Sequence, residues 1–352
     1  MERGIHNAAP HAKVIVWNWG WKREWEHEAL ELLPDNLYFM CVSESGKAIE
    51  VSGIKSEVGE YSISQMGPST RTSELWKHAK ERGLKIVAKI QINNSWESPF
   101  VPYLPVPYLI REHLGNLHRN QVDGIMLSWT LGGYPGGNLE LLTHTPEEIV
   151  EYRFGKMLAP AICKALYKFS EAFKLFPFHV KVLYYAPLSC GPGNLLWLNK
   201  TGFSATMVGF PYDDLSLWRG IYSDDVMEMS FKQLSETWQD GLDLLELGEP
   251  ALTESALDAF VDLKNVATAA YCHFRSIYLQ IRFIRLRGNT NKLELLQILD
   301  EEIILAKRLH AVVLHDSRIG FEASNHYFYT VNDLKEKVLN CEHIKSQMFC
   351  LK

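Results

Sequence analysis

The chain has 352 residues, of which 47% are hydrophobic and 22% are charged, a composition typical of globular proteins and long enough for two domains. Its net charge of -6 offers no basic field to nucleic acid or anionic lipid, and no apolar run reaches the roughly 18 residues of a membrane span. The 6 cysteines are scattered without a Cys-x-x-Cys pair, so we expect reduced thiols in a cytoplasmic protein without a metal site.

Short apolar runs alternate with helical segments in the first part of the chain. A polar excursion at 47–69 is compatible with a small hairpin, and Gly83 is placed to end the helix that follows it. Such alternation predicts parallel strands joined by right-handed crossovers. The predicted strands cover 14–16, 37–42, 85–91 and 125–127, and the helices cover 24–33, 70–82 and 107–119.

A different pattern begins after residue 145. The segment 146–174 has helical periodicity and starts with a cap at Thr145, whereas Val180–Tyr185 predicts one more strand. The stretch 186–222 is rich in Gly, Pro and aromatic residues, and loops of this length are usually functional.

Helical periodicity returns in the last part of the chain. It covers three or four amphipathic helices from 224 to 312 and a final helix at 331–345. We therefore divide the chain into a first unit with the strands, a middle unit with the long loop, and a helical carboxyl-terminal domain: residues 1–145, 146–222 and 223–352.

Polar and aromatic residues collect just after each of the four predicted strands. This one-sided placement is typical of a (β/α) barrel, whose site is formed by loops at the carboxyl ends of its strands. An open doubly wound sheet would normally carry a G-x-G-x-x-G turn leading into a helix, and the chain has none. The sequence therefore predicts an α/β fold built from units of a TIM-type (β/α) barrel.

Three tryptophans, Trp17, Trp19 and Trp21, follow the first strand. Alternate residues of an extended segment face one side, so the three indoles could wall a single cavity. Indoles pack on the apolar C–H faces of sugars while polar neighbours bind the hydroxyls. The competing interpretation is a cluster of core tryptophans, against which the polar Asn18 argues.

A polar group, Gln91, Asn93, Trp96 and Glu97, follows the third strand. Amides donate and accept hydrogen bonds at once, which suits a neutral, hydroxyl-rich ligand. A carboxylate in a Trp-walled pocket can have a raised pKa and act as a general acid. Glu97 is therefore the candidate catalytic residue, and the alternative is a loop carboxylate that bonds nearby amides.

The fourth strand leads into a Gly-rich turn that carries Trp129, Tyr134, Asn138 and Glu140. Trp129 is expected to wall the pocket, and the other three are expected to orient the ligand. Glycoside hydrolysis normally uses two carboxylates, and Glu44, Glu97 and Glu140 follow successive strands. Their pairing is geometrically feasible, although no spacing in the sequence establishes it.

The segments VIVWNWGW, KIVAKIQINNSWE and DGIMLSWTLGGYPGGNLEL resemble the later strands of a bacterial family of glycoside-hydrolase-like proteins, similar to the family 20 β-N-acetylhexosaminidases. HFRSIYLQIRFIRLRG and SRIGFEASNHYFY resemble the helical carboxyl-terminal region of those proteins. The resemblance implies that this chain holds the last four strands of the barrel, followed by a mainly α-helical domain. The Asp-Glu acid/base pair that the resemblance implies has no counterpart here, and Asn18 stands where the family often has an acid.

These observations predict a glycoside-hydrolase-like protein that binds a hexose or N-acetylhexosamine and acts on O-glycosidic bonds if a complete site is assembled. The alternative is a non-catalytic carbohydrate-binding protein, or a truncated remnant, of the same fold. Half a barrel has two open sheet edges, through which a homo-oligomer could form. No phosphate-binding or metalloprotease motif is present, so no cofactor is expected.

Overall fold

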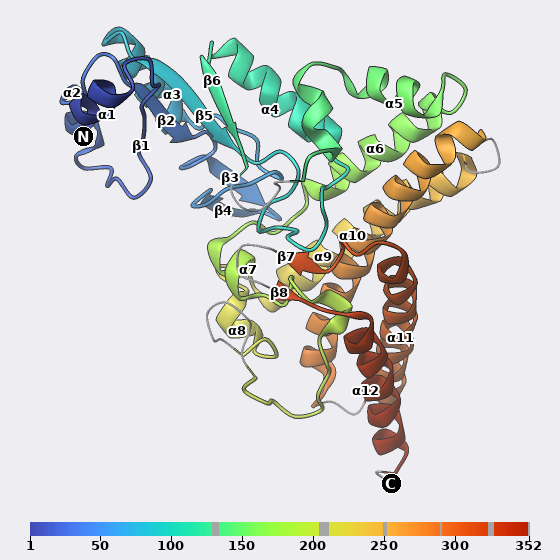
Figure 1. Cartoon of the computed structure of the whole chain (residues 1–352). Helices are drawn as coiled ribbons and strands as arrows, with labels where there is room; N and C mark the ends of the chain where they lie inside the picture. The colour runs from blue at the N-terminus through green and yellow to red at the C-terminus, as the bar shows by residue number, and fades with distance from the viewer. Residues whose placement is uncertain (129–133, 204–210, 249–251, 289–290, 323–326, 351–352) are drawn as a thin grey trace.

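The computed structural model describes residues 1–128, 134–203, 211–248, 252–288, 291–322 and 327–350. A region with a small parallel sheet lies at one end of the molecule, and long helices make up most of the rest (Figure 1). None of the described helices is both long enough and apolar enough to cross a lipid bilayer.

Four parallel strands form the sheet, in the order β1-β2-β5-β6. The register aligns Val42 of β2 with Lys89 of β5, and Lys89 with Met126 of β6. The strands occupy the places that the sequence predicts: β1 (Ile15–Trp17), β2 (Tyr38–Val42), β5 (Lys85–Ile90) and β6 (Gly124–Leu127).

The helices between the strands also follow the sequence pattern. The side chain of Ser69 caps the first turn of α3 by accepting a hydrogen bond from the amide of Thr72, and Gly83 follows the helix with a φ of +82°. The excursion after β2 is a hairpin, as predicted. These elements are α1 (Glu2–Ala8), α2 (Glu26–Glu31), β3 (Ala48–Val51), β4 (Ile54–Glu57), α3 (Thr70–Glu81) and α4 (Pro107–Arg119).

Helices dominate the chain after β6. α9 packs against α6 and α10, and α11 packs between α10 and α12. Thr145 and Glu148 form a complete capping box at the start of α5. The elements are η1 (Gly137–Leu142), α5 (Pro146–Phe154), α6 (Ala159–Phe173), α7 (Val180–Tyr185), η2 (Gly191–Gly193), α8 (Leu215–Trp218), α9 (Asp224–Gly248), α10 (Glu254–Leu286), α11 (Lys292–His315), β7 (Phe321–Glu322), β8 (Tyr327–Phe328) and α12 (Val331–Cys350).

Aromatic rings fill the contact between α6, α9 and α10. The centroid of Trp238 lies 4.6 Å from that of Phe169 and 5.2 Å from that of Phe274. Gly241, three residues after Trp238, allows this close approach, because a Cβ there would lie 2.4 Å from the ring of Phe169. The large aromatic rings, together with the lack of a side chain at Gly241, therefore set how closely the helices pack.

The predicted strand at Val180–Tyr185 is wrong, because these residues form helix α7. The ring of His179 accepts a hydrogen bond from the amide of Lys181 and so caps the start of the helix. Val182 and Leu183 are buried on it. Packing of the apolar side thus overrides the β preference of this run.

The prediction of a TIM-type barrel is also wrong. The sequence predicts the last four strands of such a barrel, followed by a separate helical domain. The described residues form a small open sheet whose outer strands, β1 and β6, each have one edge that no described strand covers. The chain beyond β6 forms helices that pack on one another instead of returning to the sheet (Figure 1). Their apolar faces are buried within a mostly helical body, so no closed barrel follows from the four strands.

Candidate functional site

A cavity of about 360 Å³ lies beyond the end of β1, and Trp19 and Trp21 wall it. Trp19 is half-exposed and stacks on Tyr61, with ring centroids 5.4 Å apart and planes 7° apart. Trp17 lies behind it, with its ring centroid 5.3 Å from that of Trp19. The other lining residues include Asn18, Val42, Ser45, Arg71 and Thr72. The cavity therefore combines two flat apolar walls with several polar groups.

Arg71, in the first turn of α3, brings a guanidinium group to this cavity. The Nε atom of Arg71 donates to Glu26 at 2.9 Å, and a second nitrogen of the same group also bonds that carboxylate. The hydrogen bond to Glu26 is the largest of the effects that raise the pKa of Arg71. Because the two charges cancel, the pair favours a neutral polar ligand over an ion.

Glu44 follows β2 and lies in the chain between the lining residues Val42 and Ser45. Its carboxylate accepts hydrogen bonds from the amide of Ser62 at 2.9 Å and from the hydroxyl of Ser43 at 2.8 Å. Burial raises the pKa of Glu44 to about 7. The hydrogen bonds from Ser62 and Ser43 lower this pKa, but by less than burial raises it. This carboxyl group therefore gains and loses its proton near neutral pH.

Lys89 on β5 does not line the cavity, but it is a buried charged residue beside Tyr61 that the sequence analysis missed. Its side chain is fully buried, its Nζ lies 4.8 Å from the centre of the Tyr61 ring, and within the described part of the chain Nζ has no hydrogen-bond partner. Burial lowers the pKa of Lys89 to about 8, although the charges of Glu44 and Glu60 act in the opposite direction. A lysine inside the apolar run KIVAKI was the available signal.

Gln91 lies two residues beyond Lys89 and is also buried. Neither atom of its side-chain amide has a hydrogen-bond partner among the described residues. Buried amides are nearly always bonded, so an unbonded one in this position is a candidate for contact with water or a ligand. Gln91 was predicted to bind substrate, and that role stays a prediction.

Glu97, the predicted catalytic residue, is fully buried and holds the loop that precedes α3. It accepts hydrogen bonds from the amide of Ile63 at 2.7 Å, from the hydroxyl of Ser95 at 2.6 Å and from the hydroxyl of Ser62 at 2.9 Å. Burial raises the pKa of Glu97, and these donors oppose the shift. Since Ser62 also donates its amide to Glu44, one serine joins the two carboxylates. The catalytic role of Glu97 stays a prediction, and its contacts are those of a loop anchor.

A second group of predicted residues joins the loops after β5 and β6 and does not line the cavity beside Trp19. The side-chain nitrogen of Asn93 donates to the carbonyl of Tyr134 at 2.9 Å, and the amide of Asn138 donates to the side-chain oxygen of Asn93 at 2.9 Å. The hydroxyl of Tyr134 accepts a hydrogen bond from Arg318 at 2.7 Å. These contacts stabilise the loops.

The last three predicted residues lie in separate surroundings. Trp96 is buried with its ring 5.4 Å from that of Tyr184. Glu140 forms an ion pair with Arg153 at 3.1 Å. Trp129 falls outside the described residues. The structure thus brings Trp19 and Trp21 to one cavity, with Trp17 against Trp19, and places the described residues predicted after β5 and β6 elsewhere.

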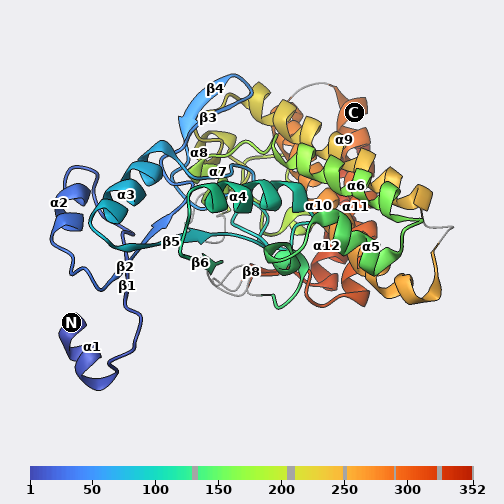
Figure 2. The ribbon, with the colours of Figure 1, turned by 90° about the horizontal axis from the view of Figure 1, so that it is seen from above.

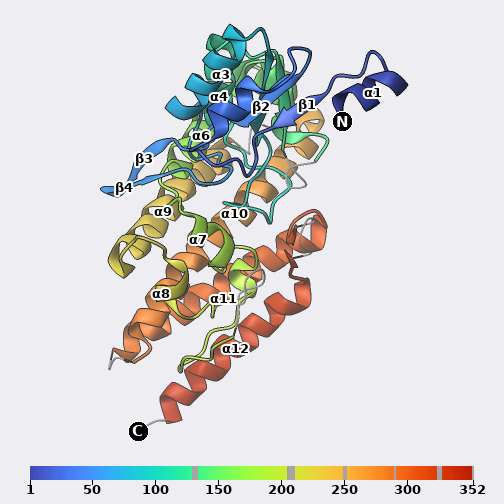
Figure 3. The ribbon, with the colours of Figure 1, turned by 90° about the vertical axis from the view of Figure 1, so that its left-hand side faces the viewer.

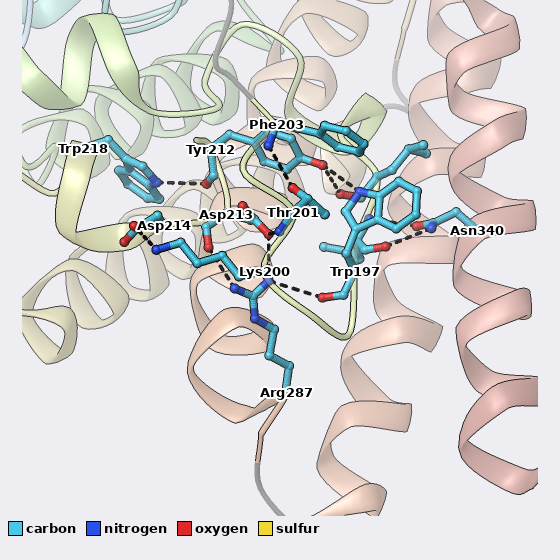
Figure 4. A network of polar contacts seen from close by, with 12 residues as sticks. Trp197, Lys200, Thr201, Phe203, Tyr212, Asp213, Asp214, Trp218, Arg287 and Asn340 are labelled. Carbon is cyan, nitrogen blue, oxygen red and sulfur yellow. Dashed lines mark hydrogen bonds and ion pairs between the residues drawn. The ribbon is translucent and has the colours of Figure 1, made fainter. Parts of the chain in front are cut away.

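The long stretch between α7 and α9 is tied to two helices, as Figure 4 shows for its described residues. Arg287 donates to the carboxylate of Asp213 at 2.9 Å, and Asn340 of α12 bonds the backbone of Leu196 at 2.8 and 2.9 Å. The indole of Trp197 donates to the hydroxyl of Tyr212 at 2.9 Å. These contacts make Asp213 part of a structural network.

In the described part of the chain, no three His, Cys, Asp or Glu side chains converge as metal ligands would. Five cysteines there are free thiols: Cys41, Cys163, Cys190, Cys272 and Cys341. The prediction that no cofactor binds stays a prediction.

No protein-family model matches the sequence, and no curated protein matches it. The structure is similar to that of a GH138 enzyme targeting pectin rhamnogalacturonan II, with a TM-score of 0.54 and 11% sequence identity. The match covers 99% of this chain and 58% of the enzyme, so the chain spans little more than half of the enzyme's length. The chain therefore shares the fold of part of that enzyme. The match gives no support to a relation with the family 20 hexosaminidases.

Proposed function

We propose that this chain is a carbohydrate-binding protein of glycoside-hydrolase-like fold, and that the sugar lies against Trp19 and Trp21. The observation that carries the proposal is the cavity of about 360 Å³ in which these two indoles meet Asn18 and the Arg71–Glu26 pair. A cavity of this size holds a ligand of one or two sugar rings.

The chemistry of the cavity fits a neutral sugar. The apolar C–H face of a pyranose would pack on an indole, and its hydroxyls would meet the amide of Asn18 and the hydroxyls of Ser45 and Thr72. The action of the GH138 enzyme on a pectic polysaccharide also favours carbohydrate as the ligand class. A hexose and an N-acetylhexosamine are both candidates, the second because of the hexosaminidase resemblance.

Binding without hydrolysis fits this chain better than catalysis by the chain alone. The carboxylate oxygens of Glu97 accept hydrogen bonds from four loop donors, and neither Glu97 nor the fully buried Glu44 lines the cavity. Two carboxylates flanking a bound sugar are what hydrolysis normally requires. Hydrolysis of O-glycosidic bonds is therefore proposed only for an assembly that supplies the missing groups.

Binding can be tested by titrating the purified chain with a panel of hexoses, N-acetylhexosamines and pectic oligosaccharides in a calorimeter. Trp19→Ala and Trp21→Ala should each weaken binding of the best ligand about tenfold, about 1.4 kcal/mol, because a packing face is lost. Tyr152→Ala is the matched control, since that aromatic side chain is exposed on α5 and should leave the affinity unchanged. An affinity that survives both Trp substitutions would place the sugar elsewhere.

Catalysis has its own test with a panel of aryl glycosides. We expect no turnover by the chain alone, and none in Glu44→Gln or Glu97→Gln. Turnover by the wild type that either substitution abolishes, with folding retained by circular dichroism, would contradict the non-catalytic proposal and restore the predicted role of that carboxylate.

A further inference from the structure

The ring of Tyr61 contacts both a wall of the cavity and the buried lysine of β5. Its plane lies 7° from that of Trp19, with ring centroids 5.4 Å apart, and the Nζ atom of Lys89 lies 4.8 Å from its centre. Trp19 is half-exposed, whereas Tyr61 and Lys89 are buried. Tyr61 therefore joins the accessible indole of the cavity to a charged group in the interior.

The register of the sheet places Lys89 on the same side as the cavity. Lys89 of β5 is aligned with Val42 of β2, and Val42 lines the cavity. Aligned residues of neighbouring parallel strands direct their side chains to the same face of a sheet. Lys89 thus approaches Tyr61 from the face of the sheet that supports the cavity.

The loop that carries Tyr61 is fixed by buried carboxylates. The amide of Tyr61 donates to Glu60 at 3.1 Å, and the amide of Ser62 donates to Glu44 at 2.9 Å. Glu60 also accepts a hydrogen bond from the hydroxyl of Tyr184 on α7 at 2.6 Å. The hairpin β3–β4, which leads into this loop, lies beside α7 in both Figure 2 and Figure 3. These contacts set the path of the loop, and the charge of Lys89 then acts on the ring that the loop presents.

The contact between Lys89 and Tyr61 is of the kind in which charge matters. Among the described residues, Nζ of Lys89 has no hydrogen-bond partner. An ammonium group over an aromatic face is attracted by the electrons of the ring, and the attraction is stronger when the cation is shielded from water. A neutral amine in the same place lacks this attraction.

We infer that Lys89 is a positioning residue of the sugar site, whose ammonium group holds the ring of Tyr61 and thereby holds Trp19 as the wall on which the sugar packs. The inference rests on the proposed function for the ligand class, and it assigns Lys89 no contact with the sugar. It adds a buried residue on which the geometry of the cavity depends.

This arrangement makes the site sensitive to alkaline pH. Burial lowers the pKa of Lys89 to about 8, against the opposing charges of Glu44 after β2 and Glu60 in the loop after β4. On β6, the residue aligned with Lys89 is the uncharged Met126. Burial raises the pKa of Tyr61, so its hydroxyl stays protonated in this range. As the pH rises past about 8, Lys89 loses its charge and the ring loses its support.

The position of Trp19 can be followed without any sugar. In a chain whose 10 tryptophans are replaced by 5-fluorotryptophan, the fluorine resonance that Trp19→Phe removes belongs to Trp19. This resonance should shift as the pH passes about 8 in the wild type and stay constant in Lys89→Met, which carries no charge there. Lys85→Met is the matched control, because it removes a lysine from the exposed start of the same strand and should keep the wild-type titration.

A second variant keeps the test decisive if Lys89→Met does not fold. Tyr61→Leu removes the ring through which the charge of Lys89 reaches Trp19, so the titration should vanish there as well. A Trp19 resonance that does not titrate in the wild type, or that titrates equally in Lys89→Met or Tyr61→Leu, would overturn the inference.

Sugar affinity gives the second readout. The Kd of the best ligand from the calorimetric panel should rise about fivefold between about pH 7.5 and pH 9.5 in the wild type and in Lys85→Met, and stay level in Lys89→Met. A wild-type Kd that stays level would contradict the inference and leave sugar binding in place. A titrating Trp19 resonance in a chain that binds no sugar would instead remove the proposed function and retain the role of Lys89 in positioning Trp19.

Discussion

A single buried carboxyl group, Glu44, links the candidate site to the pH dependence of stability. Below the ordinary glutamate pKa of 4.5, the group is protonated in both the folded and the unfolded chain. As the pH rises, the unfolded chain loses this proton first, because the folded chain keeps it until about pH 7. The folded state therefore binds more protons in this interval, and its stability falls until the pH passes about 7.

Glu44→Gln should remove this part of the pH dependence. We expect the wild type to lose roughly 3 kcal/mol more than the variant in unfolding free energy between pH 4.5 and pH 7, from the pKa shift of this one group. Urea unfolding across that range measures it. Glu140→Gln, at a half-exposed position, serves as the control and should keep the wild-type profile. Equal slopes in Glu44→Gln and the wild type would contradict the assignment.

At the residue scale, the sequence could predict which side chains lie on the same face of a segment. It could not predict which residues from distant segments contact them. Alternation along an extended segment places Trp19 and Trp21 together, and both do wall one cavity. The contact of Arg71 with Glu26 joins residues 45 positions apart, and no local pattern encodes it. The same holds for the donors that surround Glu97, several of which come from a loop more than 30 residues away.

At the element scale, a buried ion pair joins the last two helices. Lys337 of α12 lies 3.1 Å from Glu302 of α11, and both side chains are fully buried. The hydroxyl of Ser276 on α10 donates to the same carboxylate at 2.9 Å. Removing one charge of such a pair leaves the other buried without compensation, which costs more than the pair itself contributes.

Lys337→Met should therefore destabilise the chain by about 3–5 kcal/mol, whereas Lys337→Met combined with Glu302→Leu should recover much of that loss. Urea unfolding of both variants gives the two values. Lys335→Met, at an exposed position of the same helix, should change stability by less than about 0.5 kcal/mol. A double variant as unstable as Lys337→Met would argue against an uncompensated charge as the cause.

The helices with strong periodicity and clear caps could be predicted from the sequence. The absence of a closed barrel could not. The Ser69 cap and Gly83 mark the ends of α3, and Thr145 marks the start of α5. At Val180–Tyr185 the local β preference loses to burial of Val182 and Leu183. Closure of a sheet depends on where distant segments pack, so four correctly predicted strands did not determine it.

At the scale of the whole molecule, the loop after β5 connects the sheet to the long helices. The ring of Phe100 stacks on His273 of α10, with centroids 3.3 Å apart, and the hydroxyl of Tyr103 donates to Asp262 of α10 at 2.7 Å. One continuous cluster of buried apolar residues extends from the strands into these helices. The chain should therefore unfold as one cooperative unit, although the sequence predicts three units at 1–145, 146–222 and 223–352.

Tyr103→Phe tests this coupling, because it removes only the hydrogen bond to Asp262. We expect a loss of about 1 kcal/mol, since Asp262 keeps its ion pair with Arg318. Thermal unfolding followed by tryptophan fluorescence and by helical circular dichroism should give one transition that moves to lower temperature equally in both signals. Tyr108→Phe, which removes an exposed hydrogen bond to Glu147, should have a smaller effect. Two separate transitions, of which only one moves in Tyr103→Phe, would show that the sheet region and the helices unfold independently.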